Sequence, residues 1–261
     1  MTLAAGGDAR DTAGRGSAAG GRTRMLGRLR KAREALEDAE ESFTAAPPRG
    51  VPSVARDLVV AALDPEEGKL MPFGRAAVPG ALLLELVREG RLEVSGDGRK
   101  SRVTVRDLTP LGDAELDDAL LAVETGVFGN KVSRLVELLP TSDQVLDRLV
   151  AADEVTEESQ QKLGMFSVTR RYPAPSARRD EVVGRLRSAL LGESVPDERT
   201  AMLVVVLLSS TNLKHWVGRQ HVKAADCRAR EILEGLPEHE QRLVAAIKAA
   251  VVSGNADSTT L

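Results

Sequence analysis

Apolar residues recur three and four positions apart through most of the chain from Val51 onward. This spacing places apolar side chains on one face of a helix and is typical of helices that pack against a core. Glycines that follow several segments and acids that open others fit helix ends. The pattern predicts helices over residues 53–64, 80–90, 109–123, 130–140, 141–155, 177–192, 197–210, 223–235 and 239–254.

Two stretches replace helical spacing with the alternation of apolar and polar residues that is typical of β-strands. In the first, a Gly-Asp-Gly turn around Asp97 separates two such strands. The second directly follows the helix predicted at 141–155. We therefore predict a mostly α protein, a single helical domain around a buried helical bundle, with two small β-hairpins at about 91–106 and 155–171.

The two ends of the chain differ in composition from its middle. Residues 1–21 are rich in Gly, Ala, Ser and Thr, a composition typical of disorder. Residues 24–43 have helical spacing, with basic residues followed by acidic ones. This segment is either a solvated helix with its own ion pairs or a basic arm that meets an anionic surface. The predicted organisation is a disordered tail and charged amphipathic helix over 1–50, one domain over 51–252, and a disordered tail over 253–261.

Composition narrows the classes of protein to consider. The 261 residues include 42% hydrophobic ones, enough for a sizeable core, and only 2% aromatic ones. The formal net charge of −3 disfavours a general nucleic-acid binder. Cys227 is the single cysteine, which fits a reducing, cytoplasmic location. The apolar run 201–208 is much shorter than the roughly 20 residues of a membrane span, so any membrane contact is expected to be peripheral.

Residue types and spacings that would indicate catalysis or metal binding are not found in the sequence. The three histidines lack the spacing that places two ligands on one helical face: they are His215, His221 and His239. No glycine-rich phosphate loop and no nucleophile elbow occur. The carboxylates at 113–118 lie in the first turn of a predicted helix, where they complement its dipole. We therefore expect no enzyme activity, no metal and no cofactor.

Several segments, in order, resemble the Golgi phosphoprotein 3 family. They are DLVVAALDPEEGKL, PGALLLELVREGRLEV, GDAELDDAL, LVAADEVT leading to RRYP, and PDERTAMLVVVLLSS. The resemblance spans about residues 51–252 and rests on the order and spacing of apolar blocks. It implies a mostly helical fold and a peripheral membrane protein that binds phosphatidylinositol 4-phosphate or another anionic phospholipid as an adaptor.

The resemblance also implies roles for individual residues. Phe73 lies in the loop where the family carries a tryptophan. Pro79 stands where the family has an arginine, for which Arg75 substitutes in space, and Arg148 stands alone where the family has two arginines a turn apart. The implied lipid head-group residues are Phe73, Arg75, Arg148, Arg170 and Arg171. These departures suit a bacterial branch of the family, for which a different anionic lipid or a protein partner is an alternative ligand.

The second predicted hairpin has apolar residues near its tip: Leu163, Met165 and Phe166. Full burial of each would contribute about 1.5–3 kcal/mol, and each nearby basic residue adds roughly 1 kcal/mol at an anionic surface. Two such weak signals together give reversible membrane attachment. The alternatives are that the tip packs into the domain's own core or that the hairpin 155–171 forms a homo-oligomer contact.

Two other functions compete with lipid binding. The helix and hairpin over 141–171 resemble half of a winged-helix DNA-binding domain, whose recognition helix needs several basic or amide side chains. This helix offers Gln144 and Arg148 beside three aspartates, so we expect no nucleic-acid partner. The remaining alternative is a non-enzymatic protein-interaction scaffold without lipid affinity.

Overall fold

The computed structural model describes residues 49–257, apart from residues 72, 127–128, 163–165, 175–176 and 211–212. The helix predicted at 24–43 and two of the predicted tip residues, Leu163 and Met165, lie outside the described residues. The side chain of the third, Phe166, also lies outside them, although its backbone belongs to a strand.

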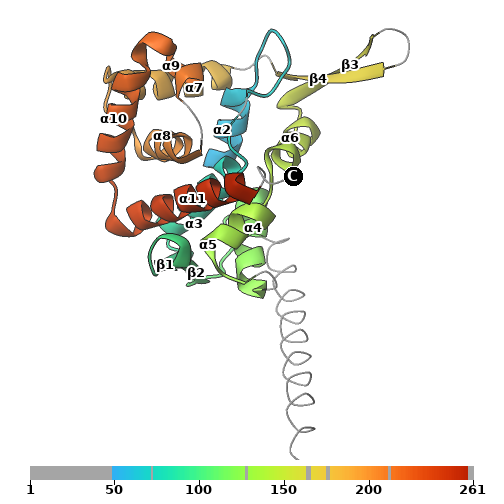
Figure 1. Ribbon diagram of the computed structural model, residues 1–261. Helices are drawn as coiled ribbons and strands as arrows, with labels where there is room; N and C mark the ends of the chain where they lie inside the picture. Colours follow the sequence, from blue (N-terminus) through green and yellow to red (C-terminus); the bar gives the residue numbers. More distant parts are fainter. Residues whose placement is uncertain are drawn as a thin grey trace, which may run out of the picture.

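The described chain folds into a body of packed helices with two separate two-stranded sheets (Figure 1). The α-helices are α2 (Val54–Ala62), α3 (Ala77–Arg88), α4 (Ala114–Thr125), α5 (Val132–Leu138), α6 (Ser142–Ala151), α7 (Ala177–Leu191), α8 (Glu198–Ser210), α9 (Lys214–Val217), α10 (Val222–Glu234) and α11 (Glu238–Asp257). The strands are β1 (Leu92–Ser95), β2 (Arg102–Val105), β3 (Val155–Lys162) and β4 (Phe166–Pro173). Two short 3₁₀ turns, η1 (Gly98–Lys100) and η2 (Arg219–His221), complete the elements. The prediction of a mostly α fold with two small hairpins is confirmed.

Helix α3 lies in the middle of the body and packs against α2, α8 and α11. Its sequence, AVPGALLLELVR, is apolar on nearly every side, and the residues from Ala77 to Val87 are all buried. A helix that is apolar all round is stable only inside a protein, so this segment is the centre of the core. The close approach to α11 depends on Gly80, where an added Cβ would lie 3.3 Å from the Ile247 side chain.

The start of α3 differs from the prediction. The helix was expected from residue 80, because Pro79 and Gly80 are typical of loops, but it begins at Ala77. Proline is tolerated in the first turn of a helix, since the N–H groups there have no acceptor within the helix. Pro79 therefore belongs to the buried first turn of α3.

Polar side chains fix the starts of α4 and α6. The Asp113 carboxylate accepts hydrogen bonds from the backbone N–H groups of Glu115 and Leu116, at 3.2 and 3.1 Å. Thr141 and Gln144 form a reciprocal capping box at α6, in which the Thr141 N–H donates to the Gln144 side chain at 2.9 Å. The interpretation of the acids at 113–118 as helix-starting residues is confirmed for Asp113.

The last helix runs further than the sequence suggested. Helix α11 continues to Asp257, so residues 253–257 are helical although they fall in the predicted tail over 253–261. Within the described residues, no helix combines the length and the apolarity that crossing a bilayer requires.

Candidate functional site

The β3–β4 hairpin projects from the helical body (Figure 1). Its strands pair antiparallel from Val155 opposite Pro173 to Lys162 opposite Phe166. The side chains of β3 from Thr156 to Ser159 are exposed. The described side chains of β3 beyond Val155 are therefore polar and exposed, on a strand that leads away from the helices (Figure 1).

The base of the projecting hairpin is firmly attached to the body. Val155 is buried, and the Ala174 N–H donates to the Glu154 carbonyl at 2.9 Å. On the other strand, the Arg171 N–H donates to the Gly68 carbonyl at 3.0 Å. Gly68 has a φ of +60°, and a Cβ there would lie 2.7 Å from the Tyr172 ring. The loop 64–70 thus packs against β4 at a point where only glycine fits.

Arg170 and Arg171 lie on opposite faces of β4 because successive side chains of a strand alternate. The Arg170 guanidinium donates to the Glu67 carbonyl at 2.9 Å and forms no ion pair with a described acid. Arg171 binds two carboxylates, Glu157 at 2.6 Å and Asp147 at 2.8 Å. The hydrogen bond to Glu157 is the main reason that the pKa of Arg171 is raised above its ordinary value. Of the two, only Arg170 keeps an uncompensated charge.

Arg148, on α6, faces helix α4 instead of joining the arginines of the hairpin. Its guanidinium forms an ion pair with Asp118, and it also lies 4.0 Å from a Glu115 oxygen. Burial raises the pKa of Glu115, while its hydrogen bond from Arg56, 3.0 Å long, opposes that rise. Arg148 is therefore already committed to acids within the molecule.

The loop that precedes α3 holds the other two predicted head-group residues. Phe73 is half-buried and packs against the hydrophobic core. Arg75 is exposed and makes no ion pair with any described residue. The five predicted residues consequently do not converge on one described pocket, but Arg75 and Arg170 both present positive charge to solvent.

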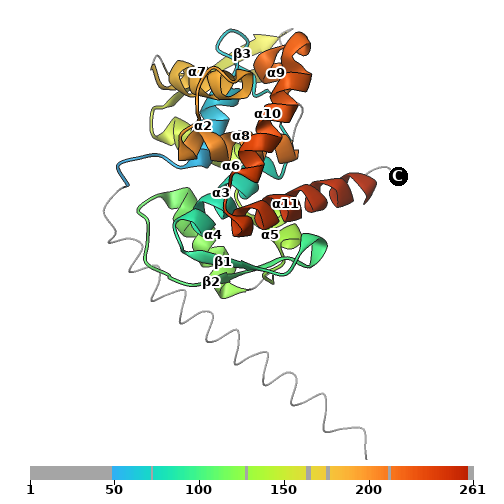
Figure 2. The ribbon, with the colours of Figure 1, turned by 90° about the vertical axis from the view of Figure 1, so that its left-hand side faces the viewer.

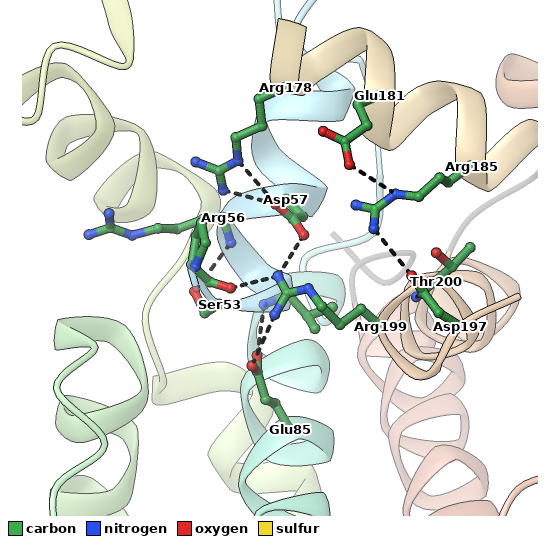
Figure 3. A network of polar contacts seen from close by, with 12 residues as sticks. Ser53, Arg56, Asp57, Glu85, Arg178, Glu181, Arg185, Asp197, Arg199 and Thr200 are labelled. Carbon is green, nitrogen blue, oxygen red and sulfur yellow. Dashed lines mark hydrogen bonds and ion pairs between the residues drawn. The ribbon is translucent and has the colours of Figure 1, made fainter. Parts of the chain in front are cut away.

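A network of buried charges joins α2, α3, α7 and α8 (Figure 3). The Asp57 carboxylate is 3% exposed and accepts hydrogen bonds from Arg178 at 2.8 Å and Arg199 at 2.6 Å. The Glu85 carboxylate is 1% exposed and accepts from the Val54 N–H at 2.7 Å. Every one of these acids has a partner, so the network holds helices together.

The same network continues to the base of the projecting hairpin. Glu154, which immediately precedes β3, forms an ion pair with Arg178 and lies 3.3 Å from the Arg56 guanidinium. Sequence reasoning missed this network. Its only signal was a single acid inside each of two apolar helices, Asp57 in VARDLVVAA and Glu85 in ALLLELV.

Beside this network lies a cavity of about 360 Å³. Its wall carries both signs of charge: Arg49, Arg88 and Arg199 with Glu85, Glu89 and Glu198. Each of these arginines forms an ion pair, for example Arg49 with Glu85 at 2.7 Å and Arg88 with Glu240 at 2.5 Å. The cavity therefore presents no unsatisfied charge that would select a ligand. No group of three metal-ligating side chains occurs among the residues that the structure describes.

The side chains that a winged-helix protein would use to contact DNA are already bound within this protein. Gln144 accepts the capping hydrogen bond from Thr141, and Arg148 binds Asp118. Asp147, on the same helix, is paired with Arg171 of the hairpin. These polar groups of helix α6 therefore contact other residues of the protein, which disfavours α6 as a DNA-recognition helix.

A search of curated proteins finds no match. The model of the family described as Golgi phosphoprotein 3 (GPP34) matches residues 54–254. The match begins with the first residue of α2, runs into the second half of α11, and includes both hairpins. It covers well over half of the chain, and the protein therefore belongs to the Golgi phosphoprotein 3 family.

Proposed function

We propose that this protein is a peripheral membrane protein that attaches reversibly to anionic phospholipid surfaces, phosphatidylinositol 4-phosphate among them. It would act on the cytoplasmic side as an adaptor, without enzyme activity of its own. Membership in the Golgi phosphoprotein 3 family supports a lipid-binding type of protein. The observation that carries the proposal is the projecting β3–β4 hairpin, which is anchored at its base and extends free of the helical body.

The sequence at the tip suits insertion into the outer part of a bilayer. Leu163, Met165 and Phe166 lie within four consecutive positions of the sequence, interrupted only by Gly164. Each would contribute about 1.5–3 kcal/mol if fully buried, and an interfacial position realises part of this. A contribution of this size gives weak attachment that needs a second, electrostatic signal.

The distribution of charge favours recognition of a charged surface over recognition of one lipid in a closed pocket. Arg148 and Arg171 already bind carboxylates, so neither is free to hold a head-group phosphate. Arg75 is exposed without an ion pair to a described residue, and Arg170 bonds only to a backbone carbonyl. Each such cation adds roughly 1 kcal/mol near an anionic surface.

Self-association through the same hairpin, as a protein-interaction scaffold, is the second candidate. The β3–β4 sheet has only two strands in the described chain, so each strand has one edge without a partner strand. Open edges of this kind are templates for pairing with another chain. This function predicts a change in oligomeric state, and not in lipid affinity, when the hairpin is altered.

Flotation of the purified protein with liposomes tests the proposal. Neutral liposomes would be compared with liposomes that contain phosphatidylinositol, phosphatidylinositol 4-phosphate, or phosphatidylglycerol with cardiolipin, each at low and high salt. We expect binding to all the anionic liposomes, and we expect high salt to weaken it because exposed charges are screened. Selective binding to phosphatidylinositol 4-phosphate that persists in high salt would instead indicate a specific head-group pocket.

Substitution at the tip sharpens this test. Phe166→Ser is expected to weaken flotation by about tenfold, the equivalent of roughly 1.4 kcal/mol. Val195→Ser is the matched control, because Val195 is 88% exposed on the connection between α7 and α8. Light scattering on the same samples measures the oligomeric state. Absence of flotation with every lipid, together with loss of an oligomer in Phe166→Ser, would replace the membrane function with the scaffold.

A further inference from the structure

Helix α9, the η2 turn and the first residues of α10 form a corner of the chain, which we call the α9–η2 corner (residues 213–223). Leu213, Trp216 and Val217 point inward and are buried. The chain then turns at Gly218, whose φ of +80° favours glycine. Backbone hydrogen bonds hold the turn, among them the Gly218 N–H to the Lys214 carbonyl at 2.9 Å. The apolar residues thus fix the direction in which the polar residues of the corner point.

The outward side of the corner is basic. Its exposed ionisable side chains are Lys214, His215, Arg219, His221 and Lys223. The sequence contains no Asp or Glu between Glu198 and Asp226. Arg219 and Lys223 form no ion pair with any residue that the structure describes. This contrasts with Arg148 and Arg171 near the hairpin, whose charges are compensated by carboxylates.

The α9–η2 corner lies at the same end of the molecule as the projecting hairpin. Figures 1 and 2, two views at right angles, both place α9, the loop before α3, and the β3–β4 sheet at the upper end of the body. Both views place the β1–β2 sheet at the opposite end. A flat surface laid across this end of the body would therefore pass close to both the hairpin and the corner.

We propose that the α9–η2 corner is a second contact site for the anionic bilayer, separate from the hairpin and from the predicted head-group residues. This inference rests on the proposed function. Its basis is the charge of Arg219 and Lys223, which no described acid compensates, on a hydrogen-bonded turn at the end of the body that also carries the hairpin. The hairpin supplies the apolar part of attachment, and the corner supplies charge and a second point that fixes the orientation of the protein.

The test is vesicle binding by the full chain, with neutral phosphatidylcholine vesicles and with vesicles that also contain phosphatidylglycerol. The double variant Arg219→Ser/Lys223→Ser removes two positive charges from the corner. The matched control is Arg99→Ser/Lys100→Ser, which removes two exposed positive charges from the η1 turn at the opposite end. Because all four positions are exposed, neither variant is expected to change the thermal midpoint noticeably, which a melting curve checks.

We expect the corner variant to bind anionic vesicles about 30-fold more weakly than the wild type, since each surface cation contributes roughly fivefold. The control variant is expected to bind within about twofold of the wild type, and the difference is expected to vanish at 1 M salt, where the screening length falls to about 3 Å. Equal binding by the corner variant and the control would overturn the inference while leaving the membrane function intact. Absence of binding by the wild type itself would reject both.

A nucleic acid is the other partner that a basic corner suggests. A mobility shift with double-stranded DNA, measured on the same proteins at low salt, separates the two partners. We expect no difference between the wild type and the corner variant in this assay. A DNA shift that the corner variant loses, with vesicle binding unchanged, would overturn the bilayer assignment.

Discussion

The two hairpins of this protein have the same topology but opposite relations to the core. In β1–β2, Leu92, Val94 and Val103 are all buried, and the ribbon packs against α3, α4 and α11. The Val103 N–H also donates to the Asn130 carbonyl at 2.9 Å, which ties the ribbon to the start of α5. In β3–β4, Val155 at the base is the one buried residue among those hairpin side chains that the structure describes.

The difference follows from which residues alternate. Strand β1 reads LEVS, so every second side chain is apolar and one face of the ribbon belongs to the core. Strand β3 reads VTEESQQK, in which no apolar residue follows Val155. The side chains of β3 from Thr156 to Ser159 are exposed, so this part of the strand adds no apolar face to the core. The β1–β2 hairpin therefore contributes to the stability of the core, whereas the β3–β4 hairpin projects from the body as an arm.

The largest predicted effect comes from breaking the buried hairpin. Leu92 is 3% exposed, and Leu92→Ala is expected to lower the free energy of unfolding by about 2–5 kcal/mol, through lost burial and the cavity that remains. Ser159→Ala, at an exposed position of β3, is expected to change it by less than about 0.5 kcal/mol. Urea unfolding followed by circular dichroism measures both. Equal losses for the two variants would mean that β3–β4 is as integral to the fold as β1–β2.

A smaller effect is expected where the projecting hairpin joins the body. Gly68→Ala places a methyl group against the Tyr172 ring and keeps a positive φ, so we expect a loss of about 2–3 kcal/mol. Gly90→Ala is the control, because Gly90 also has a positive φ but nothing lies within 4 Å of its Cβ position, and about 1 kcal/mol is expected. Limited proteolysis should then cut Gly68→Ala faster within β3 and β4. Identical stability and cleavage in the two variants would rule out the Tyr172 contact as the anchor.

The smallest effect is a difference in pH response between the loop that supports β3–β4 and the first turn of α4, beside β2. Backbone N–H groups of Glu67 and Glu66 lower the pKa of Asp64 below 3.8, in the loop that supports β3–β4. A lowered pKa contributes stability that is present above the unfolded value and is lost as pH falls through the folded value. Burial raises the pKa of Asp117, in α4 beside β2, so its contribution is present in acid and is lost as pH rises through the folded value.

NMR titration from pH 7 down to pH 2.5 measures the opposite pKa shifts of Asp64 and Asp117. As the pH falls, amide signals of the first turn of α4 should shift first, because the pKa of Asp117 is raised. Those of residues 64–70 and of the base of β3–β4 should change only at lower pH, because the pKa of Asp64 is lowered. The variant Asp64→Ala should show the altered signals of the loop already at pH 7. Simultaneous changes at both ends in the wild type would contradict the opposite signs of the two pKa shifts.

Much of the fold was predictable because its signals are local. Helical spacing, the capping residues and the alternation in both hairpins act over a few neighbouring positions. The early start of α3 escaped prediction because Pro79 and Gly80, typical of loops, are accepted there by the first-turn geometry and by the close approach of Ile247. The burial of the whole segment decided the local conformation.

The charges near the candidate site were less predictable because their partners are distant in sequence. Arg148 binds Asp118, 30 positions away, and Arg178 binds Asp57, 121 positions away. No pattern along the chain connects such residues, so a basic residue in a head-group motif and a basic residue in an internal ion pair look alike. The α9–η2 corner shows the reverse case, since Arg219 and Lys223 belong to no motif and yet remain uncompensated.

Glu154 gives the projecting hairpin a mechanical connection to the interior. It immediately precedes β3, and its carboxylate forms an ion pair with Arg178, which also forms an ion pair with the buried Asp57. A force applied at the distant end of the hairpin would therefore be passed through three charged side chains into the centre of the helical body. Helices α2 and α7 would therefore share a load on the hairpin with the backbone hydrogen bonds at its base.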